Sequence, residues 1–133
     1  MNRRKIREHI FRMIFTIEFD AFGTLDEFDM AIKKYIDELG QNEETTLYMY
    51  QKTMKIMNHV TDIDVKLNEY ADNWSTDRIA KIELAILRLA VYEMLFDDEI
   101  PSPVAINEAV ELSKKYGSEQ SFTFVNGLLA KLI

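Results

Sequence analysis

A chain of 133 residues that is 47% hydrophobic is long enough for one domain with a buried core. Four glycines and two prolines are too few for the many turns of an all-β fold, and the absence of cysteine excludes a disulfide framework and thiolate chemistry. The formal net charge of -7 argues against non-specific nucleic-acid binding by the whole surface, although it leaves room for a local basic site.

The sequence contains neither the pattern of a membrane-spanning segment nor that of a metal site. No apolar run is long enough to span a bilayer, and charged residues interrupt the apolar positions near the start, unlike in a signal peptide. We therefore expect a cytoplasmic protein without membrane contact. His9 and His59 have no partner side chain at a metal-binding spacing, so we expect neither a metal site nor a cofactor.

Residues 3–19 follow the spacing of an amphipathic helix whose start is strongly basic. The basic cluster consists of Arg3, Arg4, Lys5 and Arg7. A solvated helix face is the commoner explanation of such a cluster. Cations at a helix N-terminus oppose the macrodipole, however, so their clustering favours an anionic partner. Phe15 lies beside the apolar stripe, where it either packs at the edge of the core or contacts a partner.

A second helix is predicted to start at Thr24 and Glu27, which together have the pattern of a capping box. Gly40 is predicted to end this helix. The stretch from residue 18 to residue 44 is strongly acidic. That charge excludes this face as a phosphate-binding surface.

Two further helical segments occupy the middle of the chain. Residues 42–72 keep helical periodicity, with a break predicted near Thr61 and Asp62 because both side chains compete for backbone hydrogen bonds. Residues 77–96 carry a broad apolar face, which is typical of a helix at the centre of its bundle.

The stretch from residue 100 to residue 127 predicts a helical hairpin. Ser102 can cap its first helix, and Pro103 suits the first helical position. Gly117 is predicted to stop this helix, and an apolar line continues in a second helix beyond it.

Three blocks of sequence carry a family resemblance. They read RRKIREH at the start, RIAKIELAILRLAVYEM in the middle, and P-x-x-VAINEAVEL followed by FVNG near the end. In this order and spacing they resemble the NusB family of transcription antitermination factors. The resemblance implies an all-α, NusB-like single domain over residues 1–133. Two small helical subdomains, about 1–72 and about 73–133, would pack into one compact bundle of about seven helices.

The resemblance also implies a function without enzymatic activity. Members of the family bind the boxA element of nascent ribosomal RNA transcripts together with a small-subunit ribosomal protein, also called NusE. The complex joins the elongating RNA polymerase and suppresses premature termination. The resemblance leaves the oligomeric state open, because some members pair as homodimers and others do not.

By position, the resemblance places RNA contacts near both ends of the chain. The expected RNA-binding residues are Arg3, Arg4, Lys5, Arg7, Glu83, Arg88, Tyr116, Gln120, Thr123 and Phe124. The expected residues of the NusE-facing surface are Phe15, Phe19, Asp77 and Glu83. Positive charge would hold the RNA backbone while aromatic rings stack on unpaired bases.

Other classes of function stay open from the residues alone. A helical protein-interaction module without RNA binding fits the same periodicity, since Tyr116 and Phe124 could equally be core residues. An enzyme is disfavoured, because the sequence lacks a Gly-rich phosphate loop and a nucleophile elbow. Binding of boxA-like RNA in the presence of NusE separates the first two possibilities.

Overall fold

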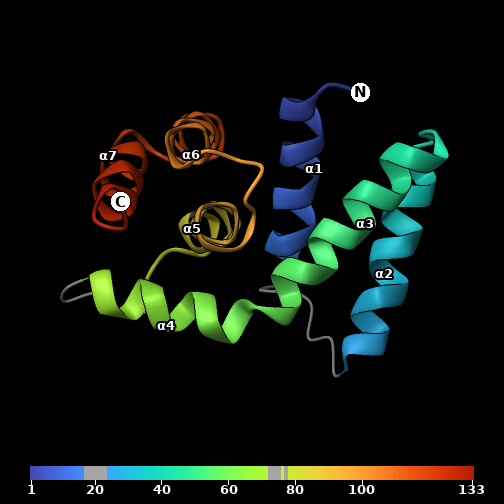
Figure 1. Ribbon diagram of the computed structural model, residues 1–133, viewed down its shortest axis with the longest axis horizontal. Helices are drawn as coiled ribbons and strands as arrows, with labels where there is room; N and C mark the ends of the chain where they lie inside the picture. The colour runs from blue at the N-terminus through green and yellow to red at the C-terminus, as the bar shows by residue number, and fades with distance from the viewer. Residues whose placement is uncertain (17–23, 72–75, 77) are drawn as a thin grey trace. The chain divides into compact units, whose positions relative to one another are not determined.

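The computed structural model describes residues 1–16, 24–71, 76 and 78–133, and this part of the chain forms seven helices without a strand (Figure 1). The helices are α1 (Arg3–Thr16), α2 (Leu25–Glu38), α3 (Glu43–Asn58), α4 (Val60–Tyr70), α5 (Lys81–Phe96), α6 (Ser102–Tyr116) and α7 (Glu119–Ala130). The predicted all-α fold is confirmed. None of the described helices is long and apolar enough to cross a bilayer.

The chain divides into two compact units, Met1–Asn58 and His59–Ile133. The long helical region breaks at His59, slightly earlier than predicted, so that α3 ends the first unit and α4 begins the second. The predicted subdomain boundary near residue 72 lies outside the described residues, and that division stays a prediction.

In the first unit, α3 lies against both α1 and α2 (Figure 1). Apolar side chains from all three helices are buried: Ile10, Met13, Ile14, Phe28, Ile32, Ile36, Met49 and Ile56. Polar contacts add to this packing. His9 Nδ1 on α1 lies 2.8 Å from the hydroxyl of Tyr35 on α2, and the hydroxyl of Tyr50 on α3 donates to the carboxylate of Asp29 on α2.

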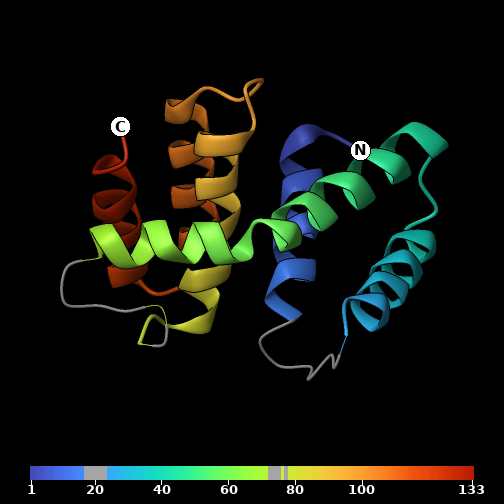
Figure 2. The same cartoon turned by 60° about the horizontal axis from the view of Figure 1, so that its bottom comes forward.

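In the second unit, α5 contacts α4, α6 and α7. Figure 2 shows α4 crossing α5 at a steep angle while α6 runs beside α5. Every residue from 84 to 93 is buried, including the charged Arg88 and Glu93. The prediction that this helix is central to its bundle therefore holds within its own unit, although the helix begins at Lys81 and not at residue 77.

Helix ends follow the predicted signals in most places. The Oγ1 of Thr24 accepts the backbone N–H of Glu27 at 3.2 Å, and Gly40 has the positive φ of 61° that ends a helix in the left-handed region. The prediction for Ser102 is wrong. Pro101 occupies the cap position, because its carbonyl already accepts the backbone N–H of Ala105 at 3.1 Å, and Ser102 is the first helical residue.

Gly117 ends α6 as predicted, but for a different physical reason. Its φ of -102° is open to any residue, so left-handed backbone is not what requires glycine here. A Cβ at this position would lie 2.6 Å from the Oγ of Ser121 and 2.8 Å from the carbonyl oxygen of Ser113. The close approach of α6 and α7 across the turn therefore requires glycine.

The first prediction concerns the core of the second unit. Ile86 and Leu89 are 0% and 1% exposed, so replacing either by Ala should cost about 2–5 kcal/mol of unfolding free energy. Urea denaturation measures this cost. Val104→Ala is the matched control, because Val104 is exposed on α6 and its truncation should stay within about 0.5 kcal/mol. A similarly small cost for Ile86→Ala would show that α5 is not the core helix.

The second prediction compares two glycines. Gly117→Ala should destabilise the protein by about 1–3 kcal/mol, because the new methyl group overlaps Ser121 and the backbone of Ser113. Gly127→Ala, within α7, meets open space and should instead stabilise the helix by up to about 1 kcal/mol. Thermal unfolding followed by circular dichroism compares the two variants, and an unchanged melting temperature for Gly117→Ala would contradict the tight turn.

The third prediction concerns pH. Burial, together with the charges of Arg12 and Lys5, lowers the pKa of His9 below its ordinary value of 6.5, although Glu8 opposes the shift. The neutral imidazole is therefore favoured more in the folded chain than in the unfolded chain. The resulting stabilisation is complete above pH 6.5 and is lost as the pH falls through the lowered pKa.

The variant His9→Gln cannot titrate at this position, so its deficit in unfolding free energy relative to the native chain should shrink between about pH 7.5 and about pH 5. Urea unfolding at both pH values measures the deficit. His59 is present in both proteins, so the difference between them reports on His9 alone. An NMR titration that places the midpoint of His9 at or above 6.5 would contradict the assignment.

Candidate nucleic-acid interface

The basic start of the chain forms the first turn of α1, which contains no acidic residue. The Oδ1 of Asn2 accepts the backbone N–H of Lys5 at 2.8 Å and so caps the helix. The side chains of Arg3, Arg4 and Lys5 are exposed there. Their charges add to the positive end of the helix dipole, which makes this turn the one end of α1 that suits an anion.

The fourth member of the predicted basic cluster has a different environment. Arg7 is only 9% exposed, so the structure does not bring its side chain to the surface with the other three. Glu8, also buried, accepts from Lys5 Nζ at 3.3 Å and from Arg12 Nη2 at 3.2 Å. Glu8 therefore offsets part of the positive charge of Lys5.

The second group of predicted residues lies at the start of α7. Ser118 and Ser121 hold this end in place, since the backbone N–H of Ser118 donates to Ser121 Oγ at 3.0 Å. An open hollow of about 680 Å³ lies beside them. It is lined by the predicted Gln120, Thr123 and Phe124 and by Glu119 and Phe122, which the sequence analysis missed. Glu119 stands four residues before Thr123, so helical spacing could have found it, whereas no signal in the sequence identified Phe122.

Aromatic rings near this turn are partly accessible. Tyr116, Phe122 and Phe124 are all half-buried, so none of the three is an ordinary core residue. The Nζ of Lys115 lies 5.6 Å from the ring centre of Tyr116, within the range of a cation–π contact. Cations and reachable rings therefore occur together at this turn.

Arg88 has a structural partner. Its Nε and Nη2 donate to the two carboxylate oxygens of Asp64 on α4 at 3.0 Å and 2.8 Å. This bidentate pair connects α5 to α4, and Arg88 is only 8% exposed. An RNA contact by Arg88 stays a prediction, and the half-buried Glu83 lies on the first turn of the same helix.

The predicted partner surface is described only in part. Phe15 is half-buried, and its ring stacks on that of Phe11, which is 2% exposed, at a centroid distance of 6.0 Å. Phe15 thus lies at the edge of the core, with part of its ring accessible. Phe19 and Asp77 lie outside the described residues.

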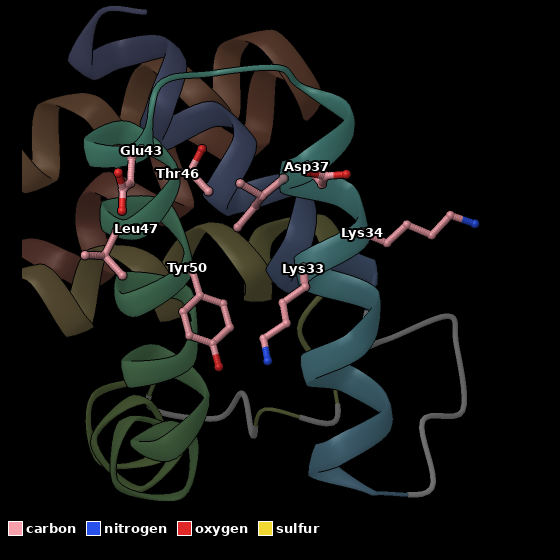
Figure 3. A pocket seen from close by; sticks show the side chains of 8 residues that line it. Lys33, Lys34, Asp37, Glu43, Thr46, Leu47 and Tyr50 are labelled. Carbon is pink, nitrogen blue, oxygen red and sulfur yellow. The ribbon is translucent and has the colours of Figure 1, made fainter.

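A second hollow, of about 620 Å³, lies between α2 and α3 (Figure 3). Lys33 Nζ pairs with Asp29 at 2.9 Å, and hydrogen bonds from Tyr50 and then from Lys33 lower the pKa of Asp29. Lys34 extends away from α3 (Figure 3), while Asp37 and Glu43 add negative charge to the lining. This mixed charge does not suit an RNA backbone. Within the described residues, no group of His, Cys, Asp and Glu could hold a metal ion.

Comparisons with known proteins agree on one family. The sequence model of the NusB family matches residues 4–133. The chain is 46% identical over 132 residues to the transcription antitermination protein NusB of Agathobacter rectalis, with 98% of each chain covered. It is 45% identical over 134 residues to that of Lachnoclostridium phytofermentans, covering 100% of this chain and 99% of the relative.

Solved structures agree with the sequence comparisons. T. maritima NusB matches with a TM-score of 0.89 at 31% identity, covering 99% of this chain and 90% of that one. A structure of the antitermination factors NusB and NusE in complex with dsRNA matches with a TM-score of 0.81 over 98% of this chain and 94% of that one, and at 24% identity it shows the shared fold. The chain therefore belongs to the NusB family, whose members are transcription antitermination factors and not enzymes.

Proposed function

We propose that this chain binds boxA-type single-stranded RNA together with ribosomal protein NusE, and that the complex modulates elongation by RNA polymerase on ribosomal RNA operons. The observation that carries the proposal is that the chain has both of the features that RNA binding requires. Exposed cations occupy the first turn of α1, and half-buried rings line the hollow on α7. A structure of the same fold contains the antitermination factors NusB and NusE in complex with dsRNA.

Electrostatics support a local RNA site. A net charge of -7 repels RNA from most of the surface, so binding requires a region where cations outnumber acids. The first turn of α1 is such a region, with Arg3, Arg4 and Lys5 exposed. The ring of Phe124 can stack on a base only if that base is unpaired, which favours single-stranded RNA over a duplex.

NusE is the proposed protein partner, through Phe15, Phe19, Asp77 and Glu83. Of the described members, Phe15 has a partly accessible ring and Glu83 a partly accessible carboxylate, and a basic ribosomal protein would complement the carboxylate. Action in the cytoplasm beside the RNA polymerase elongation complex belongs to the same proposal. Sedimentation of the protein alone distinguishes a monomer from a homodimer.

The fourth prediction tests RNA binding. Native protein is titrated with boxA-like and scrambled RNA at several salt concentrations, with and without NusE. Arg3→Gln with Arg4→Gln should weaken binding of all RNAs and flatten the salt dependence by roughly 0.7 log units per lost phosphate contact. Phe124→Ala should cost about 1–3 kcal/mol of binding free energy with little change in salt slope, because stacking involves no counterion release.

The matched control is Lys34→Gln with Lys55→Gln, which removes two exposed charges from α2 and α3 while leaving α1 intact. It should keep the native affinity and slope. If the native chain ignores boxA-like RNA even beside NusE, the protein is a helical interaction module and the proposed function is wrong.

A further inference from the structure

The five residues of the α7 hollow have a defined order around the helix. Successive residues of an α-helix are rotated by about 100°. Phe122 and Phe124 therefore lie at opposite edges of the lining face, with Glu119, Thr123 and Gln120 between them. The hollow thus has an aromatic ring at each edge and a polar strip in the middle.

A cation accompanies the ring of Phe122. The Nζ of Lys114, in the last turn of α6, lies 5.7 Å from the ring centre of Phe122 on α7. The side chain of Lys114 is 53% exposed, and its ion pair with Glu111 is long, at 3.7 Å. Exposed ion pairs of this kind contribute little free energy, so Lys114 can turn toward a phosphate at low cost.

We propose that Phe122 is a second base-stacking platform of the RNA site and that Lys114 holds the phosphate of the nucleotide stacked there. This inference rests on the proposed RNA-binding function. An aromatic face beside a cation is the combination with which single-stranded nucleic acid is bound without base pairing. The carboxylate of Glu119 lies next to Phe122 in this order and repels phosphate, so a phosphate at this edge of the hollow requires the positive charge that Lys114 supplies.

The proposal gives Phe122 a stacking role and Lys114 an electrostatic role, and one variant of each residue separates the two roles. Phe122→Leu keeps an apolar side chain at this position of α7 but removes the aromatic face. It should weaken binding of boxA-like RNA by about 5-fold or more at an unchanged salt slope. Lys114→Gln should lower the salt slope by about 0.7, with a smaller loss of affinity at high salt than at low salt.

The fifth prediction is measured by fluorescence anisotropy with labelled boxA-like RNA in the presence of NusE, over a series of KCl concentrations. Lys66→Gln is the matched control for Lys114, because Lys66 also forms an exposed ion pair three residues away, with Glu69 at 3.4 Å on α4. Phe96→Leu is the control for the ring, since Phe96 is 40% exposed on α5. Both controls should bind like the native chain.

The outcomes separate this inference from the proposed function. If the native chain binds and Phe124→Ala weakens it, while Phe122→Leu and Lys114→Gln match the native affinity and slope, the second platform does not exist. If the native chain does not bind the RNA, both the inference and the proposed function are overturned. Circular dichroism melting checks folding, and Lys114→Gln decides the matter if Phe122→Leu unfolds.

Discussion

The burial of α5 is the constraint on which the second unit depends. An unbroken run of buried residues, from 84 to 93, leaves this helix no solvent-facing side over that length. Such a helix gains stability only when other helices cover it, and α4, α6 and α7 do so. This run contains the charged Arg88 and Glu93, and Arg88 is tolerated there because its Nε and Nη2 donate to the two carboxylate oxygens of Asp64.

The position of the candidate RNA site follows from that packing. With α6 fixed along α5, the direction of α7 is set at one tight turn, where Gly117 permits close contact with Ser121 and the two serines hold the start of α7. This turn brings Lys114 of α6 next to Phe122 of α7. A local backbone constraint therefore decides which side chains share the surface of the hollow.

The distribution of charged residues fits the proposed binding of an anionic ligand by an acidic protein. The acids of α2 and α3 repel RNA, whereas the first turn of α1 contains cations only. Glu8 accepts from both Lys5 and Arg12, which allows a dense cluster of like charges on one helix at a reduced cost in repulsion. Cations at the N-terminus of α1 still oppose its dipole, a cost that a purely structural helix would avoid.

The sequence alone determined the all-α fold, the capping of α2 by Thr24, the turns at Gly40 and Gly117 and the family, because periodicity, caps and motifs are local patterns. Tertiary structure alone decided the burial of Arg7, the partner of Arg88 and the position of Phe122 in the lining of the hollow. Asp64 lies 24 residues from Arg88, and Phe122 meets Lys114 only across a turn. Such contacts depend on how helices pack, and helical periodicity identifies an apolar face without identifying the side chain that will lie against it.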